Sequence, residues 1–199
     1  MCIRDRAYTG TGSAHAENHG LGVVPEMIWV KERNGATNWN VYSKTSGATK
    51  YLLLNATQGE NTWAGYWNDT TPTSTQFTVG TDASNNSSGD NYIAYLFASV
   101  PGISKVGSYT GTGSDLNVDC GFSAGARFVL IKRTDATGDW YVYDSVQGIV
   151  AGNDPYLLLN TTAAQVTGTD YIDPLSSGCL LYTSPSPRDR TRSRMPSSA

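Results

Sequence analysis

Tyr8-Thr9-Gly10-Thr11-Gly12-Ser13 recurs as Tyr109-Thr110-Gly111-Thr112-Gly113-Ser114, and this repetition decides the fold of the chain. The same offset of 101 residues carries Trp39-Asn40-Val41-Tyr42 onto Trp140-Tyr141-Val142-Tyr143. A constant offset across so many aromatic and glycine positions does not arise by chance. The chain therefore contains two tandem copies of one module, and the architecture must be read one copy at a time.

The repeat also sets the boundaries. Copy one spans residues 7–100 and copy two spans residues 105–178, and the joint at residues 101–104 is too short to be a flexible tether. Nothing in copy two corresponds to Tyr92–Phe97, a strongly strand-like segment of copy one. Copy two is therefore predicted to be truncated.

Each copy has the local pattern of a β protein. Met27–Lys31 and Phe128–Lys132 are short apolar runs typical of buried strands, whereas Trp39/Val41 alternates with more polar neighbours, as in a half-buried strand. Clusters of Gly, Asn, Asp and Ser separate these runs, and no segment has a sustained helical period. The sequence predicts an all-β fold, with tandem β-sandwich or jelly-roll-like modules.

The two ends of the chain differ in origin from the repeats. Met1–Asp5 can be encoded by ATG TGT ATA AGA GAC, and Cys179–Ser184 by TGT CTC TTA TAC ACA TCT. These strings are reverse complements over their overlap, which is what read-through of one sequencing adapter at both ends produces. We interpret residues 1–6 and 179–199 as adapter-derived, and expect residues 179–199 to be disordered. A natural basic tail would not explain the complementarity. The true N-terminus would then be missing, and a secretion signal could not be assessed.

Removing these ends changes the charge of the protein. Lys plus Arg falls from 14 to 8 and Asp plus Glu from 17 to 15, so the net charge moves from −3 to −7. No basic patch remains that would neutralise a row of phosphates, so we expect no nucleic-acid binding. No apolar run approaches the roughly 20 residues of a membrane span, so we expect no membrane insertion.

Catalytic and metal-binding patterns are weak. His15 and His19 lie in a glycine-flanked stretch, the acidic residues are scattered, and there is no nucleophile elbow or phosphate-binding loop. Asp82, Asn85, Asn86 and Asp90 offer oxygen atoms but miss the spacing of a defined calcium loop, and such clusters are more often solvated turns. We predict no catalytic residues, no metal ligands and no cofactor.

Trp140 and the segment around it carry a resemblance to a known family. The Trp-x-Val-Tyr-Asp and Leu-Leu-Leu-Asn-x-Thr motifs and the closing strand comprise Trp140, Val142, Tyr143, Asp144, Leu157–Asn160, Thr162, Gly89, Tyr92, Ala94, Tyr95, Phe97 and Ala98. This pattern resembles an uncharacterised β-domain of bacteriophage structural proteins, found in marine tail-fibre-like proteins beside concanavalin/laminin-G-like lectin domains. The family's Arg before Gly is Gln147 here, and the family supplies no active site to transfer.

The resemblance implies a non-catalytic structural and host-recognition module of a phage virion, extracellular when assembled. Its partners would be other virion subunits, in a homo-oligomeric fibre, and a host surface glycan. The alternative is a fragment of a carbohydrate-active enzyme that acts on bacterial surface polysaccharide, with catalytic acids on unrelated loops. A depolymerisation assay separates these two hypotheses.

Aromatic residues supply the candidate binding site and a candidate core residue. Copy one carries Trp63, Tyr66 and Trp67 where the matching segment of copy two has no tryptophan, so the shared framework does not require them. The turn-rich sequence around them favours an exposed setting, in which the rings would stack on a sugar. Local packing under the loop is the alternative. Trp140 matches Trp39 in the other copy, and we expect it to be core.

Overall fold

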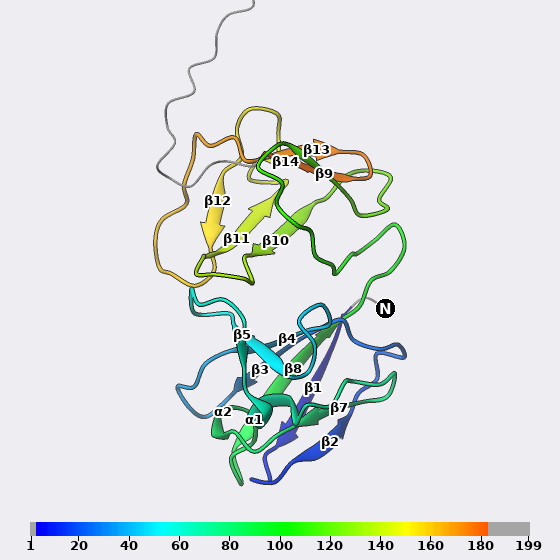
Figure 1. Ribbon diagram of the computed structural model, residues 1–199, viewed down its shortest axis with the longest axis vertical. Coiled ribbons are helices and arrows are strands. Elements are labelled where there is room, and N and C mark those ends of the chain that lie inside the picture. The colour runs from blue at the N-terminus through cyan, green and yellow to red at the C-terminus, as the bar shows by residue number, and fades with distance from the viewer. Residues whose placement is uncertain (1–2, 183–199) are drawn as a thin grey trace, which may run out of the picture.

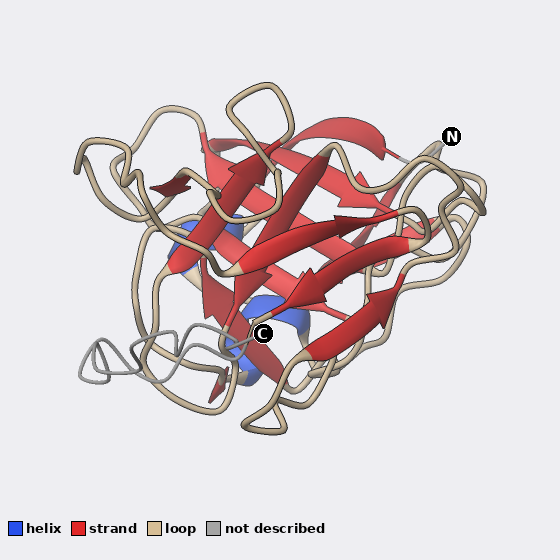
Figure 2. Ribbon diagram, turned by 90° about the horizontal axis from the view of Figure 1, so that it is seen from above, coloured by secondary structure: helices blue, strands red, loops and turns tan. Residues whose placement is uncertain are grey.

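The computed structural model describes residues 3–182 as an all-β protein in which the two copies lie one above the other along the long axis (Figure 1). Strands make up most of the regular structure, and the described helices are two single turns (Figure 2). The prediction of an all-β fold is confirmed. In residues 3–182 no helix has the length and apolar character needed to cross a membrane.

Copy one is a sandwich of two antiparallel sheets. Its elements are β1 (Ile3–Thr9), β2 (His15–Asn18), β3 (Met27–Glu32), β4 (Asn40–Ser43), β5 (Lys50–Leu53), β6 (Asn61–Thr62), α1 (Ala64–Trp67), β7 (Gln76–Val79), α2 (Ala83–Asn86) and β8 (Asn91–Phe97). The large sheet has the order β1-β8-β3-β4-β5-β6, and β2 pairs with β7 in the small sheet. The core lies between them, where Tyr92, Ala94 and Leu96 of β8 are fully buried on one face.

Copy two repeats part of this sandwich. Its strands are β9 (Leu116–Asp119), β10 (Phe128–Lys132), β11 (Trp140–Asp144), β12 (Tyr156–Leu158), β13 (Ile172–Leu175) and β14 (Gly178–Leu181). One sheet has the order β10-β11-β12 and the other β13-β14-β9. Its core is smaller and is built around Tyr143, Ile149 and Ile172.

The glycine-rich motif of copy one is held by the segment that leads into β8. The amide of Gly10 donates to Asp90 O at 2.8 Å, and the amide of Gly12 donates to Asn86 O at 2.9 Å. A Cβ atom on Gly10 would lie 2.1 Å from Ser87 O, so this close approach of two backbones requires glycine. The motif is therefore a docking element for the closing strand.

The corresponding docking element of copy two has no such strand as a partner within residues 3–182. Within the described residues no strand lies beside β10 where β8 lies beside β3, so β10 is an open edge. Tyr109, the counterpart of the buried Tyr8, is 45% exposed, and Phe128 on β10 is 57% exposed. Within residues 3–182 copy two has no counterpart of β8, and its truncation stays a prediction.

The structure corrects one expectation about the chain ends. Ile3–Arg6 form the first part of β1 and pair with β8, and Cys179–Leu181 form most of β14. The expected disorder is therefore wrong for Cys179–Leu181, while residues 183–199 lie outside the described part of the chain. Cys179 and Leu181 are buried where Phe77 and Val79 are buried in copy one, so an apolar alternation was enough to complete the strand. The adapter origin stays a prediction, which the source DNA tests.

Trp140 is buried, as predicted, but in the contact between the copies. It packs with Val41, Leu52 and Leu54 of copy one, and its Nε1 donates to Leu53 O at 2.8 Å. A second contact joins loops of the two copies, where the amide of Glu60 donates to Thr134 O at 2.7 Å. Copy two therefore covers an apolar face of the β4–β5 region.

Replacing Trp140 with Ala is expected to lower the free energy of unfolding by about 3–5 kcal/mol, the usual cost of emptying a large aromatic site. The change also removes the hydrogen bond to Leu53. Denaturant titration of the full chain measures this cost. Trp39→Ala, at the less buried counterpart, serves as the matched control and is expected to cost less. A near-neutral Trp140→Ala variant would contradict the buried contact.

Hydrogen exchange is expected to show lower protection in copy two than in copy one, because β10 has an unpaired edge and the core of copy two is smaller. The amides of β3 and β10, which occupy equivalent places in the two copies, make the direct comparison. Equal protection of these two strands would show that the missing strand does not weaken copy two.

Candidate functional site

The structure separates the three aromatic residues of the predicted binding site. Tyr66 and Trp67 are only 8% and 2% exposed and belong to the core of copy one. The Tyr66 ring meets Tyr51 edge-on at 4.5 Å between centroids, and Trp67 meets Tyr42 edge-on at 5.9 Å. The expectation that they are exposed is wrong, because α1 turns this side of the segment inward against β7 and the large sheet. Neither ring is available to stack on a ligand.

Trp63 alone of the three presents its ring to solvent. Its side chain is 53% exposed, and its Nε1 donates to Asp82 Oδ2 at 3.0 Å. The indole lies directly on Gly65, where a Cβ atom would be 2.3 Å from Nε1. Asp82 also caps α2 by accepting from the Ser84 amide at 2.9 Å, so the residue that fixes the indole is itself fixed. Trp63 is therefore an exposed aromatic ring that is held in one position before any ligand binds.

The residues that were considered for calcium around α2 have structural roles. Asn85 and Asn86 are fully buried. The Asn86 side chain donates to Ser13 O and Gly80 O and accepts from the Thr11 amide, while Asn85 donates to Tyr66 O. Since these side-chain amides are hydrogen-bonded to backbone groups, they are not free to bind an ion.

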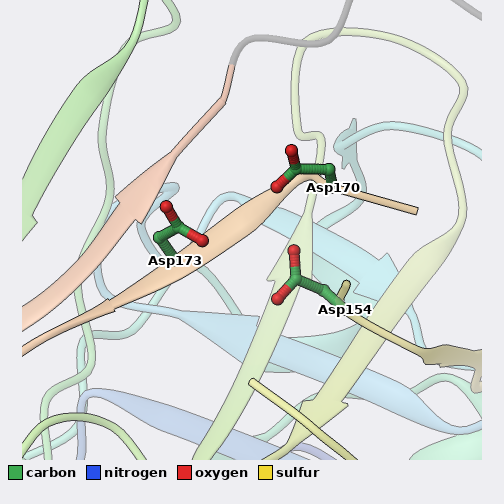
Figure 3. A group of neighbouring side chains, drawn as sticks. All are labelled: Asp154, Asp170 and Asp173. Carbon is green, nitrogen blue, oxygen red and sulfur yellow. The ribbon is translucent and has the colours of Figure 1, made fainter. Parts of the chain in front are cut away.

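Three carboxylates of copy two come together at a place that the sequence analysis did not identify. Asp154, Asp170 and Asp173 each offer an oxygen atom within 4.8 Å of the others, and the three side chains point toward a shared space (Figure 3). Asp154 is fully buried, and the other two are partly buried. All three ligand atoms are oxygen, the type that calcium and magnesium prefer.

Asp154 is held in position by the backbone. Its Oδ2 accepts from the amides of Tyr171 and Ile172, both at 3.0 Å, and its own amide donates to Thr169 O at 2.6 Å. Burial raises the pKa of Asp154, and repulsion from Asp170 and Asp173 raises it further, against the lowering effect of the two amides. Ionising this carboxylate is therefore costly unless positive charge is supplied.

Sequence reasoning missed this cluster because its members are far apart along the chain. Asp154 precedes β12, whereas Asp170 precedes β13 and Asp173 is the second residue of β13. Only the packing of β13 beside the segment before β12 brings them together. Two acids spaced as in Asp170-x-x-Asp173 are too common to indicate a site, so the sequence carries no usable signal.

Gly65→Ala is expected to release the Trp63 indole, since the new Cβ atom and the ring cannot occupy their present places. The backbone of Gly65 is helical, so alanine adds no backbone strain. In NMR spectra the indole N–H of Trp63 should exchange faster with solvent in the variant, having lost Asp82. Gly111→Ala, where nothing lies within 4 Å of the added atom, is the control. An unchanged exchange rate of the indole N–H would contradict the conclusion that Gly65 and Asp82 hold the ring in place.

Comparison with known proteins identifies a family but does not identify a function. No curated protein and no solved structure matches the chain. One family model matches, over residues 6–190, which covers both copies. The chain belongs to the family described as a domain of unknown function, DUF7483.

Proposed function

We propose that the protein is a non-catalytic structural and recognition module of a phage tail-fibre-like virion protein, and that it binds a glycan at Trp63. The observation that carries the binding part is the fixed indole, half-exposed, seated on Gly65 and bonded to Asp82. The virion setting rests on the resemblance of the repeat motifs to phage β-domains.

Carbohydrate is the ligand class that this arrangement favours. A flat aromatic ring offers a face to the apolar side of a sugar, and nearby polar groups bind the hydroxyls. Asn61 and Thr62, exposed in β6, precede Trp63 directly and offer an amide and a hydroxyl. Since the indole is already held in place, little conformational entropy is lost when the ligand binds.

A structural role fits the way the two copies associate. The Trp140 side chain is buried against copy one, so the two copies are joined by an apolar contact as well as by the short joint at residues 101–104. Such a chain of packed modules suits a fibre, in which other virion subunits and further copies of the same chain are the expected partners.

The alternative, a fragment of a carbohydrate-active enzyme, would need carboxylates that reach a substrate. Asp154 has a raised pKa, which suits a general acid, but it is fully buried and its Oδ2 is occupied by two backbone amides. The enzyme hypothesis therefore ranks second. An assay for depolymerisation of bacterial surface polysaccharide tests it directly, and turnover would overturn the non-catalytic proposal.

On an array of bacterial surface glycans, the full chain is expected to bind at least one glycan and the Trp63→Ala variant to lose about 1–3 kcal/mol of that affinity, roughly fivefold to 150-fold. The expected loss reflects removal of the stacking surface. Tyr109→Ala removes another exposed aromatic side chain and is the matched control, expected to bind as the unaltered protein does.

Two outcomes would count against the glycan site. One is binding by the unaltered chain that Trp63→Ala, still folded by circular dichroism, leaves unchanged. The other is the absence of binding to any bacterial surface glycan. Trp67→Ala is unsuitable as a test, because it would empty a core site.

A further inference from the structure

We propose that Asp154, Asp170 and Asp173 form a calcium site in copy two, which ties the segment before β12 to the start of β13. The proposal concerns a different part of the molecule from Trp63 and does not depend on glycan binding. It rests on the convergence of the three carboxylates (Figure 3) and on the state of the Asp154 side chain.

The first step is the burial of an incompletely bonded carboxylate. Asp154 has no exposed surface, and its Oδ1 has no hydrogen-bond partner in residues 3–182. Buried polar atoms are nearly always bonded, so an orphaned carboxylate oxygen requires an explanation. The Oδ1 atom of Asp173 is also buried without a partner in the described part of the chain. Two such carboxylate oxygen atoms in one cluster are placed to bind a group of positive charge.

The second step is the charge of the surroundings. Within residues 3–182, neither Asp154 nor Asp173 forms an ion pair with Lys, Arg or His. Like charges this close in a partly dry site cannot all remain ionised without compensation. A divalent cation among three carboxylates would balance most of their charge.

The third step is the choice of cation. The cluster contains neither histidine nor cysteine, so the ligands are all hard oxygen atoms and zinc is disfavoured. Calcium accepts irregular arrangements of carboxylates, carbonyls and waters, whereas magnesium demands near-ideal octahedral geometry and gives up its water reluctantly. Three carboxylates, one of them fixed by backbone amides, leave the remaining positions to water or backbone oxygen.

Copy one shows that the module itself does not need this charge. In this part of the repeat Tyr51–Asn55 recurs as Tyr156–Asn160, so the offset between the copies has grown from 101 to 105. This offset places Thr49 where copy two has Asp154. The interior of copy one near this point is filled by Tyr66 and Trp67, which have no tryptophan counterpart in copy two. The carboxylates are thus specific to the copy with the smaller core, where a bound ion would add the stability that packing lacks.

The geometry predicts what the ion would stabilise. Asp154 is already joined to the segment before β13, because Thr169 Oγ1 donates to Asp154 O at 2.7 Å and Gly168 N donates to Asn153 Oδ1 at 3.1 Å. The hydroxyl of Tyr182 donates to Asp173. An ion between the carboxylates would lock these contacts together.

The test uses the full chain freed of metal with EDTA and then titrated with calcium chloride. Melting temperature should rise by on the order of 10 °C at a calcium concentration a hundredfold above Kd, if copy two melts as a unit. Amide exchange at Tyr171 and Ile172 should slow at the same time. Terbium, used as a luminescent substitute for calcium, should be sensitised by the nearby Tyr182 and displaced by calcium.

Variants assign the effect to the cluster. Asp154→Asn and Asp173→Asn should abolish the calcium shift and the terbium signal, yet should melt in EDTA at or above the temperature of the unaltered chain, since each removes a repelling charge. Asp69→Asn, an exposed acid of copy one, is the control and should keep the full response.

Other outcomes overturn the proposal. It fails if calcium leaves melting, exchange and terbium luminescence unchanged, or if folded Asp154→Asn responds like the unaltered chain. An equal response to magnesium chloride at the same concentration overturns the assignment to calcium.

Discussion

The pairing of β8 with both β1 and β3 is the interaction on which copy one depends. Three residues of β8 are fully buried, and the segment before the strand holds the glycine-rich motif against its own backbone. A strand that pairs on both sides satisfies all of its backbone groups, so the large sheet can close over the core. Removing β8 would open the sheet, release β1 and free the motif at once.

Copy two, which has no counterpart of β8 within the described residues, shows what happens without this pairing. The repeated motif at Tyr109 is present but has no strand to hold, and β10 is left with an open edge. Copy two is instead supported through Trp140, which lies against copy one. Cys179 and Leu181 supply the apolar side chains that its small sheet requires. The segment predicted to be adapter-derived can complete a strand in this way, because a strand needs little more than alternating apolar residues and an open edge.

The sequence was sufficient for the properties that follow from periodicity and repetition. The β class and the burial of Trp140 both follow from comparing the copies. It was insufficient where tertiary packing decides the outcome. Tyr66 and Trp67 lie in a turn-rich segment that looks exposed, yet one helical turn buries both, while Trp63 stays outside because the indole rests on Gly65. Asp154, Asp170 and Asp173 lie together only because β13 packs beside the segment before β12, which is distant in the sequence.

The two copies fill their interiors by different physical means. Copy one buries amides: Asn40, Asn85 and Asn86 are fully inaccessible, but their neutral side chains are bonded mainly to each other and to the backbone. Such a network needs no counter-charge. Copy two buries a carboxylate at Asp154, and backbone amides occupy only one of its two oxygen atoms. The amide network leaves Asn40 Oδ1 without a partner in the described residues, but this atom is neutral, whereas a buried carboxylate cluster carries charge that a proton or a cation must balance. The proposed calcium site would therefore make the stability of copy two depend on bound cations, whereas the buried amides of copy one bind none of their partners through charge.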